Sequence, residues 1–213
     1  MLAPLVDGVV AQLEEANRAR EEALKACRLV IRLSGSAIRS VHRRQFAEAD
    51  ATIDQAEQAL RSAQDALRPF PDLTYAGFLH DAEKEFVEAR CTRLLIGVEP
   101  SGPLGVTLPG PQELAVDGRS WLKGLSEAAS ELRRHLLDRL REGDLARAEA
   151  LVGSMEEVYD ALVVVDFPDA ITLGLRRTVD ALRAVLERSR ADVTTTAVQH
   201  RLIAAIGTEP PAR

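Results

Sequence analysis

A helical repeat of apolar residues between Ser120 and Asp144 constrains the fold of this chain more than any other feature. Gly143 suits the left-handed residue that ends a helix, and Asp144 suits the N-cap of the next helix. The apolar positions recur at intervals of three and four residues, which places them on one face of an α-helix. They are Leu122, Leu125, Ala129, Leu132, Leu136 and Leu140.

Similar repeats run along most of the chain. Aromatic residues make up only 4% of the sequence, no stretch alternates as a strand does, and Pro100–Pro111 is the one long irregular segment. We therefore expect an all-α protein, a single bundle domain of about seven helices over residues 1–207, with a disordered tail at 208–213. Besides the central helix, the repeats predict helices over residues 2–42, 46–67, 72–98, 145–165, 173–189 and 192–206.

Charge and cysteine content exclude several classes of protein. The formal net charge of −6 gives no global basic field, so any nucleic-acid site must be local or created by assembly. Cys27 and Cys91 are isolated, which predicts reduced, packed thiols rather than a disulfide framework or a zinc site. No apolar run approaches the ~20 residues of a membrane span, and the first residues lack the pattern of a signal peptide. We expect a cytoplasmic protein with no membrane partner.

The first predicted helix is long and ends in a basic cluster. A periodic helix well over ~25 residues long indicates a bundle spine or a contact between subunits. The cluster comprises Arg39, His42, Arg43 and Arg44. These side chains either compensate the helix dipole or contact phosphate, and the sequence leaves both interpretations open.

Two pairs of glutamates mark a candidate metal site. Glu85 and Glu88 share one face of a predicted helix, and Glu127 and Glu131 share a face of the next. Antiparallel packing of the two helices could bring all four together, where they would repel one another without a cation. Such hard oxygen ligands suit Mg²⁺ or Mn²⁺, which activate water in phosphodiester hydrolysis. The same acids also fit an exposed helix surface with intrahelical ion pairs, so spacing alone does not decide.

Four segments, in this order, resemble the translin/TRAX family. K-E-F-V-E-A at Lys84–Ala89 resembles the TRAX pattern Q-E-Y-V-E-A. W-L-K-G-L-S-E-A-A-S-E-L-R-R at Trp121–Arg134 resembles Y-L-L-G-V-A-D-L-T-G-E-L-M-R. The segments at residues 143–149 and 166–180 fit later helices of the family, so the match covers about residues 28–192. The resemblance implies a seven-helix subunit, assembly into a closed octameric barrel, and binding of RNA or single-stranded DNA.

The resemblance also implies an activity and its residues. TRAX-type subunits are magnesium-dependent endoribonucleases, whereas translin-type subunits bind nucleic acid without the full acidic set. Position by position, the catalytic and metal-binding acids fall on Glu85, Glu88, Glu127 and Glu131. Glu127 stands where the family pattern has aspartate and is one methylene longer, which puts the fine geometry in question.

We therefore expect an RNA-binding endoribonuclease that uses Mg²⁺, or Mn²⁺, on single-stranded RNA inside a homo-octameric barrel. The alternatives are a non-catalytic single-stranded RNA- or DNA-binding protein and a purely structural helical scaffold. His80 and His135 near the acids are either proton shuttles or packed histidines. The basic residues expected to hold phosphates are Lys84, Arg90, Arg93, Arg133 and Arg134.

Overall fold

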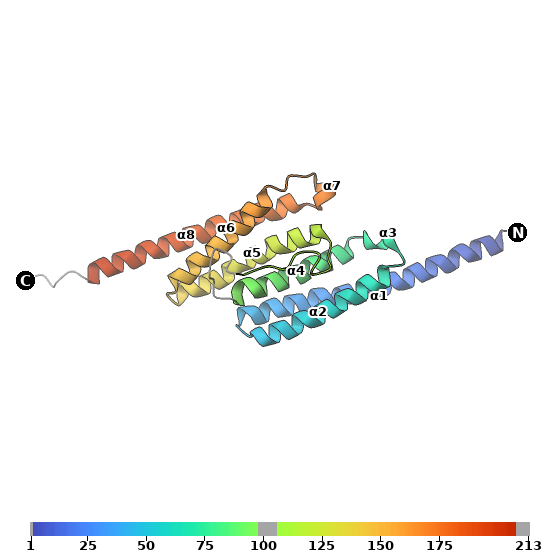
Figure 1. Cartoon of the computed structure of the whole chain (residues 1–213), viewed down its shortest axis with the longest axis horizontal. Coiled ribbons are helices and arrows are strands. Elements are labelled where there is room, and N and C mark those ends of the chain that lie inside the picture. Colours follow the sequence, from blue (N-terminus) through green and yellow to red (C-terminus); the bar gives the residue numbers. More distant parts are fainter. Residues whose placement is uncertain (1, 98–105, 208–213) are drawn as a thin grey trace, which may run out of the picture. The chain divides into compact units, whose positions relative to one another are not determined.

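The computed structural model describes residues 2–97 and 106–207, and within these ranges the chain is all helical, with no strand. The predicted all-α class is therefore confirmed. The chain divides into two compact units, Met1–Arg93 with Pro109–Gly124, and Leu94–Leu108 with Leu125–Arg213. The helices, labelled in Figure 1, are α1 (Ala3–His42), α2 (Phe46–Leu67), α3 (Pro71–Thr74), α4 (Phe78–Gly97), α5 (Gly118–Arg141), α6 (Leu145–Val163), α7 (Asp169–Thr172) and α8 (Leu175–Gly207).

The first unit is built on an antiparallel hairpin of α1 and α2, which lie side by side in Figure 1. A tight turn joins them, with Arg44 in the left-handed region at φ 62°. Small buried residues such as Ala37 and Ala56 let the two helices approach closely, and Phe86 of α4 fills the core beside them. Both helices match their predicted ranges, because the apolar repeat of each continues along the helix and no proline interrupts its interior.

Cys27 and Cys91 both lie buried in this unit as free thiols. Burial, together with the nearby charges of Glu83 and Asp81, raises the pKa of Cys27 from 9.0 to about 11. Burial raises the pKa of Cys91 to about 12. The thiols therefore remain protonated and pack as small apolar groups, as the sequence predicts.

The single helix predicted over residues 72–98 is wrong in its first turns. The chain instead forms the short α3, turns, and begins α4 at Phe78. Gly77 makes the turn with φ +93°, a conformation that side chains with a Cβ rarely adopt. Tyr75, which belongs to the apolar repeat of the predicted helix, is 76% exposed because it lies in this turn.

The second unit contains the remainder of α5 with α6, α7 and α8. Asp144 caps α6 as predicted, since its side chain accepts a hydrogen bond from the Arg147 backbone N–H at 3.0 Å, and Gly143 precedes it at φ +80°. Helices α6 and α8 pack together. Their buried residues include Leu151, Met155 and Leu162 of α6 and Leu182 and Leu186 of α8.

The last two predicted helices are one continuous helix, α8. The expected break at residues 190–191 contains neither glycine nor proline, so nothing in the backbone ends the helix there. The carboxylate of Asp192, where the second of these helices was predicted to start, forms an ion pair with Arg133 at 2.8 Å. The helical structure is interrupted instead between α7 and α8, where Leu173 and Gly174 adopt positive φ angles of 53° and 80°.

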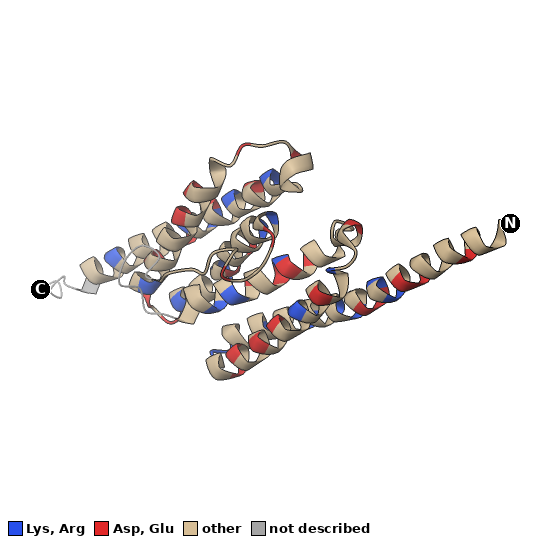
Figure 2. Ribbon diagram, turned by 45° about the vertical axis from the view of Figure 1, so that its right-hand side comes forward, with Lys and Arg blue, Asp and Glu red and all other residues tan. Residues whose placement is uncertain are grey.

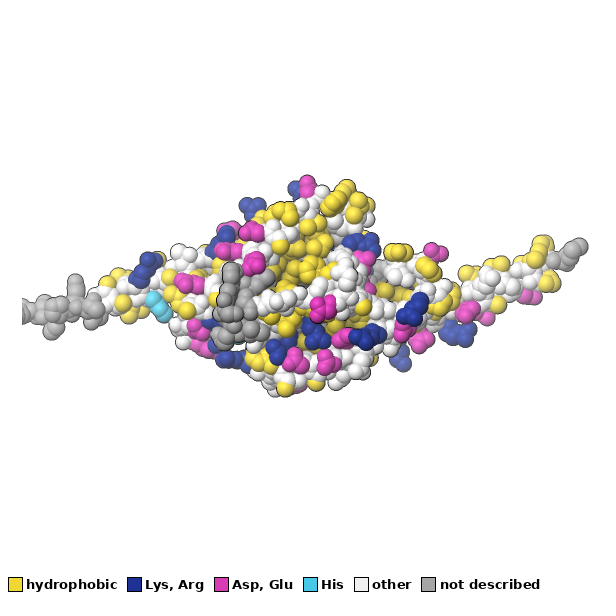
Figure 3. Space-filling view, in the orientation of Figure 1, with side chains coloured by type: hydrophobic (Ala, Val, Ile, Leu, Met, Phe, Trp, Pro, Cys, Tyr) yellow, Lys and Arg dark blue, Asp and Glu magenta, His cyan; other side chains and the backbone are white. Residues whose placement is uncertain are grey.

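Two helix ends carry exposed apolar side chains, visible along the N-terminal arm of α1 in Figure 3. No helix among the described residues is long and apolar enough to cross a membrane. The predicted tail at 208–213 and part of the irregular segment, residues 100–105, lie outside the described residues. The exposed apolar residues are Leu5, Val6, Val9, Val10 and Leu13 on α1, with Val198, Leu202, Ile203 and Ile206 on α8.

We predict that the arm of α1 is buried between subunits. Replacing Leu5 and Val9 together by glutamate should lower the particle mass measured by light scattering, because two charges would enter an apolar contact. Thermal unfolding of the core should change little, since both positions are exposed within one chain. The matched control is Glu15→Gln on the same arm. A wild-type mass of 23.2 kDa, or an unchanged mass in the double variant, would contradict the prediction.

Candidate metal centre

A close approach of backbones joins the first turns of α5 to α4. A Cβ atom on Gly124 would lie 2.6 Å from the Lys84 carbonyl oxygen and 2.7 Å from the Val87 Cβ. Gly124 has no positive φ angle, so its requirement for glycine comes from contact with α4. Because Gly124 has no side chain, the α5 backbone lies directly against α4 at this point.

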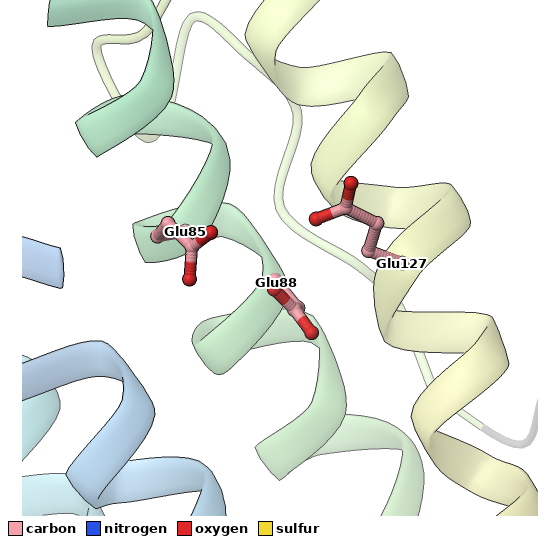
Figure 4. Close-up of side chains that lie close together, drawn as sticks. All are labelled: Glu85, Glu88 and Glu127. Atoms are coloured by element: carbon pink, nitrogen blue, oxygen red, sulfur yellow. The ribbon is translucent and has the colours of Figure 1, made fainter. Parts of the chain in front are cut away.

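The acids of the two helices lie next to this contact. Glu85 and Glu88 flank Val87 on α4, and Glu127 follows Gly124 by nearly one turn of α5. One carboxylate oxygen from each of the three glutamates lies within 4.8 Å of the others (Figure 4). None of the three residues is exposed. The helices therefore place the carboxylates of three of the four predicted acids near one another.

The donor set fits a hard divalent cation. All three ligand atoms are carboxylate oxygens, which suit Mg²⁺, Mn²⁺ or Ca²⁺ and not a thiolate-seeking metal. Oxygens on opposite sides of Mg²⁺ lie about 4.2 Å apart, at about 2.1 Å from the ion. The three ligand atoms lie within 4.8 Å of one another, so direct binding by all three needs at most a small inward rotation of the side chains. Mg²⁺ also retains several waters in protein sites, which relaxes that requirement.

Two further predicted site residues, Lys84 and Glu131, lie outside the group of three acids. The ammonium of Lys84 pairs with Glu85 at 2.9 Å, so it offsets charge in the triad. Glu131 lies one turn after Glu127 on α5 but does not belong to the group of three. It lines a surface groove of about 570 Å³ together with Arg133 and Arg134. A role for Glu131 as a fourth ligand stays a prediction.

Three of the four arginines expected to hold phosphates form ion pairs with carboxylates. Arg90 pairs with Asp54 and Glu57 of α2, each at 3.3 Å. Arg93 pairs with Asp50 at 2.8 Å and stacks over the ring of Phe46 at 4.7 Å. Arg133 pairs with Asp192 and donates to the Ser189 hydroxyl at 3.2 Å. Only Arg134 of this set is exposed. Sequence spacing could not predict these pairings because each partner is more than 30 residues away.

A buried polar network lies within the first unit at the start of α5, and the sequence did not predict it. The Ser120 hydroxyl donates to Glu83 at 2.8 Å and lies 2.6 Å from Nδ1 of His80. Glu83 also accepts from the Asp117 backbone N–H at 3.1 Å and from the Gln64 side chain at 3.1 Å. The network ties α2, α4 and the segment before α5 to one another.

The network fixes the protonation of its members. Because the single Ser120 proton goes to Glu83, the Nδ1 atom of His80 must donate to the Ser120 oxygen. Burial lowers the pKa of His80, and the charge of Lys123 lowers it further. Burial raises the pKa of Glu83, although its hydrogen bonds oppose this. His80 is therefore a packed, neutral histidine, and His135, the other candidate proton shuttle, is also buried.

Comparison with known proteins gives the same architecture. No family model matches the chain. The uncharacterized protein MJ0175 of Methanocaldococcus jannaschii is 27% identical over 192 residues, which cover 88% of this chain and 80% of that protein. The crystal structure of AfC3PO is 31% identical, with a TM-score of 0.81, and covers 91% of this chain and 97% of its own.

Two further structures extend the comparison. AfC3PO in a complex with duplex RNA has a TM-score of 0.80 at the same identity and coverage. Apo-NeC3PO, at 20% identity and a TM-score of 0.78, shows the fold alone. Fold and site together define an all-α protein with an acidic cluster between two helices. With 31% identity to AfC3PO over nearly the whole chain, this chain belongs to the translin/TRAX family.

Gly124→Ala tests the helix contact. The new Cβ would overlap the Lys84 carbonyl, so we expect a loss of about 1–3 kcal/mol in the free energy of unfolding, measured by urea denaturation. The matched control is Gly153→Ala in α6, where a Cβ meets nothing within 4 Å. That variant should gain up to about 1 kcal/mol from helix propensity. Equal effects at the two glycines would show that the contact does not limit the approach of α4 and α5.

His80→Asn tests the polar network through pH. The pKa of His80 is lower in the fold than its ordinary value of 6.5, so below pH 6.5 the unfolded chain binds a proton that the folded chain does not. The free energy of unfolding should therefore fall as the pH falls, by at most about 1.4 kcal/mol per pH unit from this residue. Asparagine retains a donor near Nδ1 and should remove this part of the pH dependence. His200→Asn, at an exposed position of α8, is the matched control. An unchanged pH dependence in His80→Asn would refute the assignment.

Proposed function

We propose that this protein is an RNA-binding endoribonuclease subunit that uses Mg²⁺, or Mn²⁺, to hydrolyse single-stranded RNA within a homo-octamer. The observation that carries the proposal is the convergence of Glu85, Glu88 and Glu127 within 4.8 Å on α4 and α5. Three carboxylates at such separations repel one another, and a divalent cation offsets that repulsion. The Lys84 ammonium, which pairs with Glu85 at 2.9 Å, offsets part of this negative charge.

A divalent cation in this site would lower the pKa of a bound water and stabilise negative charge on a phosphate oxygen. Hydrolysis adds that water across one P–O bond of the RNA backbone, and the leaving oxygen takes up a proton. Glu85, Glu88 and Glu127 would bind the cation. Lys84 holds the Glu85 carboxylate in place through its ion pair. The backbone contact at Gly124 keeps the two ligand-bearing helices at a fixed separation, which is the preorganisation that such a site requires.

Support for an RNA substrate comes from the relatives. AfC3PO has been solved with duplex RNA and shares 31% identity with this chain. The exposed apolar arm of α1 supports assembly, since large apolar patches on a monomer mark contact surfaces. The RNA would be cleaved inside the assembly, where water and competing chains have limited access.

Glu127→Gln is the sharpest test of cleavage. It preserves shape and removes one ligand charge, so Mg²⁺-dependent cleavage of a labelled single-stranded RNA should fall by at least about a hundredfold, or ~2.7 kcal/mol of barrier. RNA binding measured in EDTA should persist. Glu127→Asp should retain activity, because aspartate is the residue of the family pattern at this position. The matched control is Glu157→Gln, at an exposed position of α6.

The same assay decides the remaining alternatives. Loss of cleavage in Glu131→Gln would make Glu131 the fourth acid, and a wild-type rate would restrict the site to three. A wild-type protein that retards RNA without cleaving it would instead be a non-catalytic nucleic-acid-binding subunit. Cleavage at the wild-type rate by a properly assembled Glu127→Gln protein would refute the metal site itself.

A further inference from the structure

The C-terminal half of α1 has a charge composition unlike the rest of the chain. No aspartate or glutamate occurs between Leu24 and Ala47, although the whole chain carries a net charge of −6. The acidic residues of α1 all lie before this stretch, at positions 7–22 (Figure 2). The stretch contains six strongly basic residues: Lys25, Arg28, Arg32, Arg39, Arg43 and Arg44.

Most of these cations share one face of the helix. Lys25, Arg32 and Arg39 follow one another at steps of seven residues, which drift only ~20° per step around a straight helix. Arg28 and Arg43 fall beside the same line. The buried residues of α1, such as Cys27 and Val30, lie on the opposite side. We name Lys25, Arg28, Arg32, Arg39 and Arg43 the basic ridge; all five are exposed, and they span about 27 Å along the helix.

The basic ridge lacks acidic partners within the described part of the chain. None of its five residues takes part in an ion pair there, whereas the nearby Arg61, Arg68, Arg90 and Arg93 all do. Like charges three and four residues apart on a helix repel by a few tenths of a kcal/mol per pair. The folded subunit carries this repulsion at its surface, and an anionic partner would relieve it.

The N-terminal part of the ridge borders a groove. Lys25, Arg28 and Arg32 line a surface groove of about 610 Å³, with Ala59 and Ser62 of α2 on its other side. Ala26 and Leu29 add apolar surface, and Glu22 is the single acidic residue of the lining. A groove of this kind combines positive charge with a small apolar floor, which suits a phosphate and the sugar attached to it.

We infer that the basic ridge binds the phosphate backbone of RNA, as a second contact surface apart from the acidic triad. The inference rests on the proposed RNA function and adds a binding site to it. A row of cations about 27 Å long matches a polymer with regularly repeated anions. An acidic protein partner fits less well, because the cores of protein interfaces are depleted in charge, and among residues 24–47 Ile31 is the single large apolar side chain that is exposed.

The test is the triple variant Lys25→Gln, Arg28→Gln, Arg32→Gln. Binding of a labelled oligouridine is measured in EDTA over a salt series, with the oligoadenosine–oligouridine duplex as a second probe. Each lost phosphate contact lowers the salt dependence of a single strand by about 0.7, so the slope should fall by about 2. The affinities of wild type and variant should converge as salt rises. A change limited to one probe identifies whether the ridge reads single strands or duplex.

The control triple is Arg20→Gln, Arg61→Gln, Arg68→Gln. It removes the same number of positive charges from exposed positions of the same unit, but each of these arginines already pairs with an acid on its own helix. Its salt slope should remain close to that of wild type. Equal slopes in the two triples would overturn the ridge as a site, because the effect would then come from net charge alone.

The remaining outcomes separate this inference from the proposed function. If wild type binds RNA and the ridge variant binds it equally well, the ridge inference fails and the nuclease proposal stands. If Glu127→Gln abolishes cleavage while the ridge variant alone loses affinity, both stand. If the ridge variant has wild-type affinity for RNA but a smaller particle mass, the ridge binds an acidic face of another copy and the RNA assignment is wrong.

Discussion

The candidate site depends on one steric constraint, the contact of Gly124 with the backbone of α4. Because Gly124 has no side chain, the α5 backbone lies directly against the Lys84 carbonyl and the Val87 side chain of α4, and the longer carboxylates nearby can reach one another. A larger residue would push the helices apart by more than the few tenths of an ångström that a site for a small cation tolerates. The buried network of His80, Glu83 and Ser120 supports the same region, since it ties the start of α5 to α4 through hydrogen bonds.

Sequence periodicity predicted most of the fold because helix formation here follows a local rule. The ranges of α1 and α2 and the Asp144 cap agree with the structure, since apolar spacing and capping residues act over a few positions. Two predictions were wrong for a related reason: an unbroken helix across Gly77, and a break within what is the single helix α8. Local spacing predicts a helix interior around a glycine in a periodic stretch, and it predicts a helix start at a capping residue. Tertiary contacts determine which of these local preferences the fold adopts.

The acids of the candidate site could be predicted from the sequence, whereas the ion pairs formed by the nearby arginines could not. Glu85, Glu88 and Glu127 were identified from helical spacing and family resemblance, and the structure brings them together. The partners of Arg90 and Arg133 come from distant parts of the chain, so no local pattern contains them. The basic cluster with Arg39 and Arg43 was recognised from the sequence, with phosphate contact as one of its two interpretations. Lys25, Arg28 and Arg32 were not, although their signal lies in the sequence: a stretch of more than twenty residues without an acid in an acidic protein.

The two buried thiols have a practical consequence. Because burial raises the pKa of Cys27 to about 11 and that of Cys91 to about 12, neither side chain forms an appreciable amount of the thiolate that maleimides and iodoacetamides attack near neutral pH. The natural chain should therefore react only slowly with these thiol reagents. A cysteine introduced at any exposed position becomes the one reactive handle, so dyes, spin labels or crosslinkers can be attached without first removing the native residues.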